Sequence, residues 1–255
     1  MRKVFKYTLV DLARNRFVLA YAFLLLLLSE GLFQIEGDPI KALLSLVQVV
    51  QALVPLIALI FTIVYIYDTQ EFTQLLAVQP IGRAAIVGGR MLALGVALLT
   101  AQAFGLGLPL VVHARSIASV LLFGSAGALA LVFSALGTLI ALKQRDKARG
   151  VGIGLAIWFL FVLVYDALLM WLMFAFSERP IEPLVVPLAA LNPIDLARIA
   201  VMLRMDMAAM MGYSGAIYKE FFGSTSGIAV AMGIMAVWIL WPTWVCFRYF
   251  RRKDL

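Results

Sequence analysis

Two carboxylates inside otherwise apolar stretches are the first residues of this sequence whose type could do chemistry. Glu30 lies in the run Phe17–Ile35, and Asp166 lies in the run Gly150–Phe176. Acids in such runs are rare in membrane proteins, where they line ion or proton pathways or pair with another polar group. The sequence leaves two interpretations open: the acids line a vestibule, or each is held in a structural pairing within a helix bundle.

A cluster of methionines in residues 202–211 could bind a soft metal ion. Thioethers favour Cu(I), but methionines at helical spacing also serve as apolar filler. Met202 and Met205 share a helical face, and Ala209, the next position on that face, has no thioether. We therefore predict no metal in this chain and keep Met202 and Met205 only as candidates for a soft-metal site.

No other constellation in the sequence predicts catalysis. The chain has no Gly-rich loop followed by Lys and Ser or Thr, so it should not hydrolyse ATP alone. His113, the one histidine, lies in a short polar turn where we expect it to be solvated, and its pairing with Ser214 would need two loops to converge. Cys246 is the sole cysteine, and its apolar surroundings indicate a packing role. We predict no catalytic residue and no cofactor held by this chain.

Six long apolar runs must position these residues. Of the whole sequence, 64% is hydrophobic and 14% is charged, against roughly half and a quarter in globular proteins. A helix needs about 20 apolar residues to cross a bilayer, whereas the strands of a membrane barrel have about 10 and alternate apolar with polar. This pattern excludes a soluble protein and a membrane barrel. We predict an all-α integral membrane protein with a single transmembrane domain, residues 1–255, that crosses the membrane at 17–35, 43–67, 91–112, 117–142, 150–176 and 227–247.

The distribution of Lys and Arg orients these spans. If the N-terminus lies inside, the inner loops gather most of the basic residues, including those at 143–149 and 248–253. Because basic residues accumulate in cytoplasmic loops, we predict a multi-pass protein of the inner membrane with both termini in the cytoplasm. Glu30 and Asp166 then both lie toward the outer side. The membrane also accounts for the net charge of +7, so we predict no nucleic-acid partner.

The first residues, Met1–Arg16, mix basic with apolar side chains. Phe5, Leu9 and Leu12 recur at spacings of four and three residues. This spacing predicts an amphipathic helix in the inner interface, with its apolar face in lipid and its basic face toward anionic headgroups.

A second short helix is predicted on the inner side, between the second and third spans. Leu75, Leu76 and Val78 form a short apolar stripe, Glu71 stands near its start, and Pro80 ends it. A helix of this kind, parallel to the membrane, would rest one face on the bundle and present the other face to a partner.

The outer segment 177–226 contains a clear helix start. Asn192 is a suitable N-cap, Pro193 fits the first helical position, and Asp195 falls in the first turn. We predict an amphipathic helix from here to about Met211 that lies on the outer surface or re-enters the membrane.

The order of these elements and several short motifs resemble the permease subunits of exporter-type ABC transporters. The residues from Glu71 to Arg83 are similar to the coupling segment of that class, although Phe72 stands where the class usually has glycine and the segment is shorter. Within the class, Ala156–Asp166 and Leu191–Arg198 resemble the permeases of nitrous oxide reductase maturation. The resemblance extends over nearly the whole chain.

This resemblance implies partners and site residues. Two copies of the chain would pair with two cytoplasmic ATPase subunits, which bind ATP and Mg²⁺, and a periplasmic accessory protein would dock on the outer helix. ATPase coupling would fall to Glu71, Phe72, Thr73, Gln74, Leu75, Leu76 and Arg83. Docking of the outer partner would fall to Asn192, Pro193, Asp195 and Arg198. The transporter would serve assembly of copper–sulfur centres, by moving a small sulfur or copper species or by transmitting ATP-driven motion to the periplasmic partner.

Three alternatives remain open at this point. The first is another exporter permease of the same architecture, for haem or a small hydrophobic compound. The second is an intramembrane enzyme, which would need Glu30 and Asp166 as paired catalytic groups. The third is a passive membrane scaffold that works without an ATPase.

Overall fold

The computed structural model describes residues 1–176, 187–205 and 225–252, and within these ranges it contains helices and no strand. Six helical segments are long and apolar enough to cross a membrane, as the sequence predicts. They are Arg16–Glu36 (α2), Pro39–Asp68 (α3), Arg83–His113 (α5, η1 and α6), Ile117–Lys143 (α7), Lys147–Ala175 (α8, η2 and α9) and Ala229–Arg251 within α13 (Thr225–Arg252). Shorter helices in the described residues include α1 (Arg2–Ala13), α4 (Gln70–Val78) and α11 (Pro193–Arg204), and residues 187–190 are helical as well.

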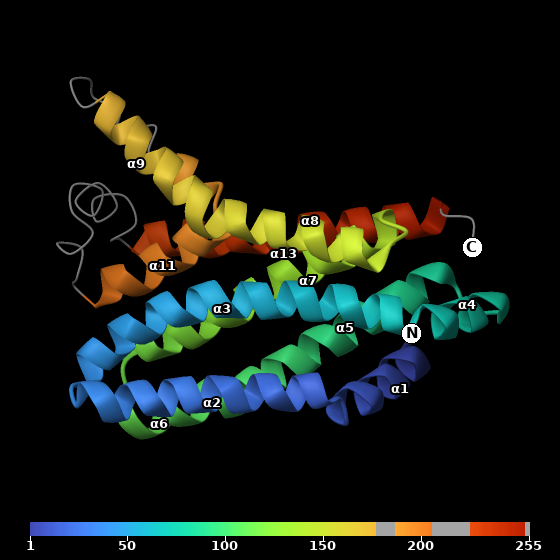
Figure 1. The fold of residues 1–255 in the computed structure, drawn as a ribbon, viewed down its shortest axis with the longest axis horizontal. Helices are drawn as coiled ribbons and strands as arrows, with labels where there is room; N and C mark the ends of the chain where they lie inside the picture. The colour runs from blue at the N-terminus through green and yellow to red at the C-terminus, as the bar shows by residue number, and fades with distance from the viewer. Residues whose placement is uncertain (177–186, 206–224, 253–255) are drawn as a thin grey trace.

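The helices form one elongated bundle with two distinct ends (Figure 1). Helices α1 and α4 lie at one end together with the C-terminal turns of α13, and we call this the α4 end. Helices α6 and α11 lie toward the opposite end. Helix α7 is the most enclosed span, because α3, α5, α11 and α13 all pack against it.

Small residues allow α3 and α7 to approach closely. A Cβ added at Gly137 would lie 2.8 Å from the carbonyl oxygen of Leu59, so only glycine fits there. Near this contact the Thr62 hydroxyl donates to the Ser134 hydroxyl at 3.0 Å. Small residues and hydroxyl hydrogen bonds of this kind hold transmembrane helices together where apolar burial provides no driving force.

The third span changes its helical form before Pro109. A proline cannot donate to the carbonyl four residues earlier, and here that carbonyl belongs to Gly105. Residues Ala103–Gly107 form the π-helix η1, and the Ser29 hydroxyl of α2 donates to the Gly105 carbonyl at 2.7 Å. A Cβ at Gly105 would lie 2.5 Å from the Ala22 carbonyl oxygen, so the glycine admits α2 to this position. The carbonyl freed by the proline is thereby satisfied inside the bundle, as a membrane interior requires.

One boundary and one helix orientation differ from those expected. The third span begins at Arg83 instead of residue 91, because the helix continues toward the α4 end and buries Arg90 there. Helix α1 forms as expected, but its apolar side packs on α5 and does not face lipid. Leu12 is fully buried, and a Cβ at Gly89 would lie 3.1 Å from the Cβ of Val4. The expected orientation of α1 is therefore wrong, since glycines on α5 offer α1 a close-fitting surface within the protein.

The fifth span packs least against the rest of the bundle. Only 6% of its most apolar window is buried, compared with 61% for α7. Its contact with α3 is local: Gly154 lies against Ile63, and the Trp158 indole donates to the Ala52 carbonyl at 2.9 Å. The described bundle therefore leaves most of the apolar surface of α8, η2 and α9 uncovered.

Candidate functional site

The short helix predicted between the second and third spans exists as α4, at the end of the bundle. It begins directly after α3, with Glu71 in its first turn, where the helix dipole favours an acid. It ends at Val78, two residues before Pro80. Its position beyond the ends of the spans, shown in Figure 1, leaves one side of the helix open.

The open side of α4 is rich in apolar atoms. Phe72 is 45% exposed, Leu75 67% and Val78 89%. Glu71 and Gln74 are exposed as well. Among the predicted stripe residues, only Leu76 packs on the bundle, where it joins Val4, Ile86, Cys246 and Phe250 in a small cluster. The structure turns Leu75 and Val78 outward, away from the bundle.

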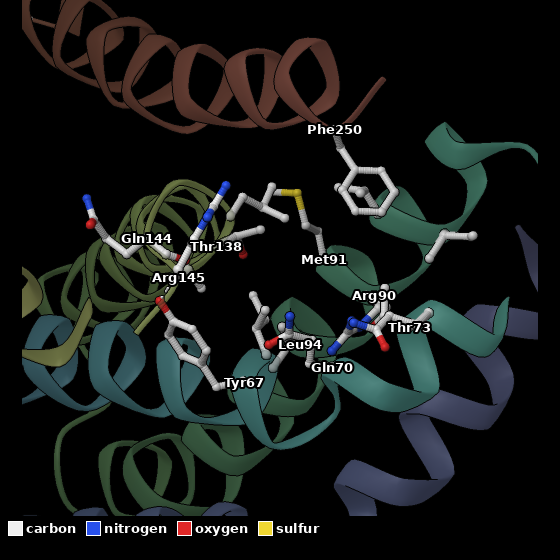
Figure 2. A pocket seen from close by; sticks show the side chains of 16 residues that line it. Tyr67, Gln70, Thr73, Arg90, Met91, Leu94, Thr138, Gln144, Arg145 and Phe250 are labelled. Carbon is white, nitrogen blue, oxygen red and sulfur yellow. Dashed lines mark hydrogen bonds between the residues drawn. The ribbon is translucent and has the colours of Figure 1, made fainter. Parts of the chain in front are cut away.

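The inward side of α4 is held by a buried arginine of α5. Arg90 is 7% exposed, and its guanidinium donates to the hydroxyls of Thr73 and Thr69 (Figure 2). These hydroxyls in turn donate to the carbonyls of Thr69 and Tyr65, at 2.9 and 2.6 Å. Arg90 therefore fixes the start of α4 to the end of α3 through charge-assisted hydrogen bonds.

The same anchor reaches α1. The Arg90 guanidinium lies over the ring of Tyr65, 5.8 Å from its centroid. The Tyr65 hydroxyl donates to Asp11 of α1 at 2.8 Å. Helices α1, α3, α4 and α5 are thus joined at one point behind the open face of α4.

Arg83 stands at the start of α5, close to the last turn of α13. Its guanidinium lies 3.5 Å from the carbonyl of Arg251, to which it donates. Of the residues expected to couple an ATPase, five are exposed, namely Glu71, Phe72, Gln74, Leu75 and Arg83, whereas Thr73 and Leu76 attach α4 to the bundle. Arg83 joins α5 to α13. The predicted segment therefore divides into an open face and an anchored face.

The two acids within the spans are each paired with a different partner. Glu30 lies 2.9 Å from the Nε2 atom of His113, whose ring stacks on Phe33 with centroids 5.0 Å apart. His113 was expected to be solvated, and the structure corrects this. Asp166 instead accepts from Arg198 of α11 at 2.7 and 2.9 Å. The structure thus supports the structural pairing, and it does not bring the two acids together as one catalytic pair.

Helix α11 starts as its sequence predicts. The Asn192 side chain accepts from the backbone of Ile194 at 3.0 Å, and Pro193 follows in the first turn. The Asn192 amide also donates to the carbonyl of Phe161 and to Asp195, both at 2.8 Å. The described helix ends at Arg204, so the expected extension to residue 211 lies outside the described residues.

The residues expected to dock an outer partner face into the bundle. Asn192 and Pro193 are buried, Asp195 is 4% exposed, and Arg198 binds both Asp166 and Asp195. Burial raises the pKa of the Asp195 carboxyl to about 7, with Arg198 lowering it and Asp166 raising it. These four residues therefore position α11 on the fifth span, and a partner at this surface would meet other side chains.

No family model matches this chain. It is similar to the probable ABC transporter permease protein NosY of Pseudomonas aeruginosa, with 30% identity over 226 aligned positions that cover 80% of this chain and 82% of the relative. It is also similar to the probable ABC transporter permease protein NosY of Stutzerimonas stutzeri, with 29% identity over 273 positions, 96% of this chain and 95% of the relative. The chain belongs to the NosY family of ABC transporter permeases. It is a multi-pass membrane protein of that family.

Two members of the methionine cluster at residues 202–211 lie in the described part of this NosY-family permease, and both pack on the protein. Met202 is buried, and Met205 is partly buried against the main core. The other members of the cluster lie outside the described residues. Cys246 is fully buried, as its sequence context predicts.

Arg90 is not among the candidate residues that the sequence predicts. The available signal was its position, one residue before the apolar run that begins at Met91, because a charge at that depth needs a partner. No local signal linked Tyr65 to Asp11, since these residues lie 54 positions apart and meet only through helix packing.

Proposed function

We propose that this permease is the membrane subunit of an exporter-type ABC transporter in the inner membrane, with both termini in the cytoplasm, and that its ATPase partner docks on α4. The open face of α4 carries this proposal. Phe72, Leu75 and Val78 are exposed beyond the ends of the spans, while Arg90 fixes the opposite side of the helix. A helix that passes force from a partner to a bundle needs both features: apolar area for the partner and a rigid attachment behind it.

The remaining partners follow from the same proposal. Two copies of the chain assemble with two ATPase subunits, which bind ATP and Mg²⁺, and the uncovered surface of the fifth span provides apolar area for pairing. A periplasmic accessory protein binds at the end opposite to α4. The assembly acts in maturation of the copper site of nitrous oxide reductase, either by moving a small sulfur or copper species or by transmitting ATP-driven motion to the accessory protein.

Leu75→Asp tests the docking face. Because Leu75 is 67% exposed, the change leaves the permease folded but introduces a charge where the ATPase would bury a leucine. Loss of that burial is worth about 1.5–3 kcal/mol, or roughly a tenfold to hundredfold loss of affinity. We expect tagged permease to recover much less ATPase subunit from its native membrane, and the recovered complex to lose permease-dependent ATP hydrolysis.

Ile35→Asp is the matched control, because Ile35 is 81% exposed and ends the span α2 at the opposite end of the bundle. This variant should recover the ATPase as well as the native chain does. If Leu75→Asp retains both the ATPase and its stimulation, the docking face is not on α4. If the native chain recovers no ATPase in good yield, the transporter assignment itself fails.

The finer role is tested in cells that lack this chain. We expect nitrous oxide reductase purified from such cells to lack copper at its copper–sulfur centre, whereas c-type cytochromes keep their haem. Restoration by the native chain and by Ile35→Asp, but not by Leu75→Asp, would tie the maturation role to the same docking face. Normal copper content with missing haem would instead identify a haem exporter.

A further inference from the structure

A cavity of about 390 Å³ lies directly behind α4, on the side opposite to its open face. It is enclosed by the end of α3, by α4, by the first turns of α5, by the end of α7 and by Phe250 of α13. Figure 2 shows Arg90 and Thr73 on one side of this cavity and Arg145 and Tyr67 on the other. Both charged side chains that line it are therefore cations.

The charge of Arg90 is only partly compensated by the protein. A guanidinium has five N–H donors, and its assigned hydrogen bonds in the described residues go to two neutral hydroxyls, Thr69 and Thr73. The Thr69 hydroxyl, which accepts from Arg90, donates to the carbonyl of Tyr65 at the C-terminus of α3. The C-terminus of a helix supplies about half a unit of negative charge. A buried cation without a carboxylate partner is costly, so a site of this kind favours an anionic ligand.

Three carboxylates at this end of the bundle are held by other groups. Asp68 at the end of α3 binds Lys147 at 2.6 Å, and Asp11 accepts from the Tyr65 hydroxyl. Asp146 caps α8 by accepting from the backbone of Arg149 at 3.0 Å. In the described part of the chain, neither Arg90 nor Arg145 forms an ion pair.

We propose that this cavity is a binding site for a phosphate-type oxyanion, held between Arg90 and Arg145. The side-chain amides of Gln70 and Gln74 also line the cavity and supply further donors. Tetrahedral oxyanions match such a set, because guanidinium groups bind their oxygens through paired, charge-assisted hydrogen bonds. The anion is either the phosphate of an anionic membrane lipid, whose headgroup carries no compensating cation, or a free phosphate or sulfate ion. The bound anion would bridge α5 and the turn after α7, behind the start of α4. Its binding would not require an ATPase.

The test measures thermal unfolding of the full-length permease with two kinds of probe. In detergent, inorganic phosphate or sulfate is compared with chloride at equal ionic strength, so that general screening is the same. In lipid nanodiscs, phosphatidylglycerol is compared with phosphatidylcholine. A ligand that binds only the folded protein raises its melting temperature as its concentration exceeds the dissociation constant.

The decisive variant is Arg145→Gln, because Arg145 is exposed and its loss should not disturb the fold. Arg149→Gln is the matched control: it removes an equal charge from the nearby first turn of α8, but Arg149 does not line the cavity. Arg145→Gln should weaken the apparent affinity for the anion about tenfold, and Arg149→Gln should leave it unchanged. Arg90→Lys, which keeps the charge but loses the planar fork, should weaken it as well.

The outcomes separate the two sources of the anion. Stabilisation by phosphatidylglycerol but not by free phosphate or sulfate, weakened in Arg145→Gln but not in Arg149→Gln, identifies a lipid phosphate. Stabilisation by the free ion in detergent, again weakened in Arg145→Gln but not in Arg149→Gln, identifies a free oxyanion. The proposal is overturned if no anion stabilises the native chain, or if Arg145→Gln and Arg149→Gln respond equally.

Discussion

Two arginines at opposite ends of this bundle are partly or fully enclosed, and their surroundings differ in charge. Arg198 of α11 faces two carboxylates, Asp166 and Asp195. Arg90 of α5 faces two threonine hydroxyls and the ring of Tyr65. The first cation is more than neutralised by the protein, whereas the second keeps much of its charge.

The difference separates a structural contact from a site that can take a ligand. The charge of Arg198 is compensated by its two carboxylate partners, so the residue serves to attach α11 to the fifth span through Asp166. Arg90 attaches α4 in a similar way, but it also lines a cavity together with Arg145. Buried charges are stable only when they are paired, and the unpaired one therefore marks the end of the molecule where we expect an anion and an ATPase.

The largest effect is expected from Arg198→Ala. This change leaves Asp166 and Asp195 without their shared cation and should lower the free energy of unfolding by about 2–3 kcal/mol. Thermal unfolding of the purified permease measures the loss. Arg115→Ala is the control at the same end, because Arg115 is exposed and donates only to the carbonyl of Val111.

A triple variant sharpens this test. Adding Asp166→Asn and Asp195→Asn to Arg198→Ala removes the unpaired charges and should restore part of the lost stability. If the triple variant is as unstable as the single one, the cluster acts through packing and not through charge.

A smaller effect is expected from Asp195→Asn, which removes the charge and keeps the shape of the side chain, but replaces one of the two oxygens that accept from Asn192 and Arg198 with a donor. The pKa of Asp195 in the folded protein is about 7, above its ordinary value of 3.8, because the carboxyl is buried. The folded state thus holds a proton that the unfolded state has released. The associated stability is fully present below about pH 4 and is lost as the pH rises through about 7.

The measurement is the melting temperature of the purified permease between pH 5 and pH 8. We expect a decline with rising pH in the native chain and a flatter profile in Asp195→Asn. Parallel profiles would show that Asp195 does not change its protonation in this range.

The smallest effect is expected at the α4 end, from Thr73→Val. Loss of one hydroxyl that accepts from Arg90 should cost about 1 kcal/mol, and this cost should stay local to α4. Hydrogen exchange should become faster in residues 70–78 and remain unchanged in α11. Thr100→Val is the control, since the Thr100 hydroxyl donates within its own helix to Ala97. Equal protection of α4 in both variants would show that Arg90 does not anchor this helix.

Local sequence signals predicted most of the helices and their caps. Asn192 and Pro193 mark the start of α11, and Pro80 marks the end of α4, because capping and proline effects act within a few residues. The early start of the third span was not predicted, since the burial of Arg90 depends on hydroxyls from α4 and from the turn before it. The same limit applied to His113, whose partner Glu30 lies 83 positions away.

The sequence by itself determined the class of the protein and its six spans, because the cost of placing a residue in lipid depends mainly on its own type and its near neighbours. It also marked the segment that forms α4. Only the tertiary structure decided which partner each charged residue received and which side of α4 stayed open. Those outcomes depend on how closely the helices approach, as at Gly105 and Gly137, and such contacts join residues that are distant in the chain.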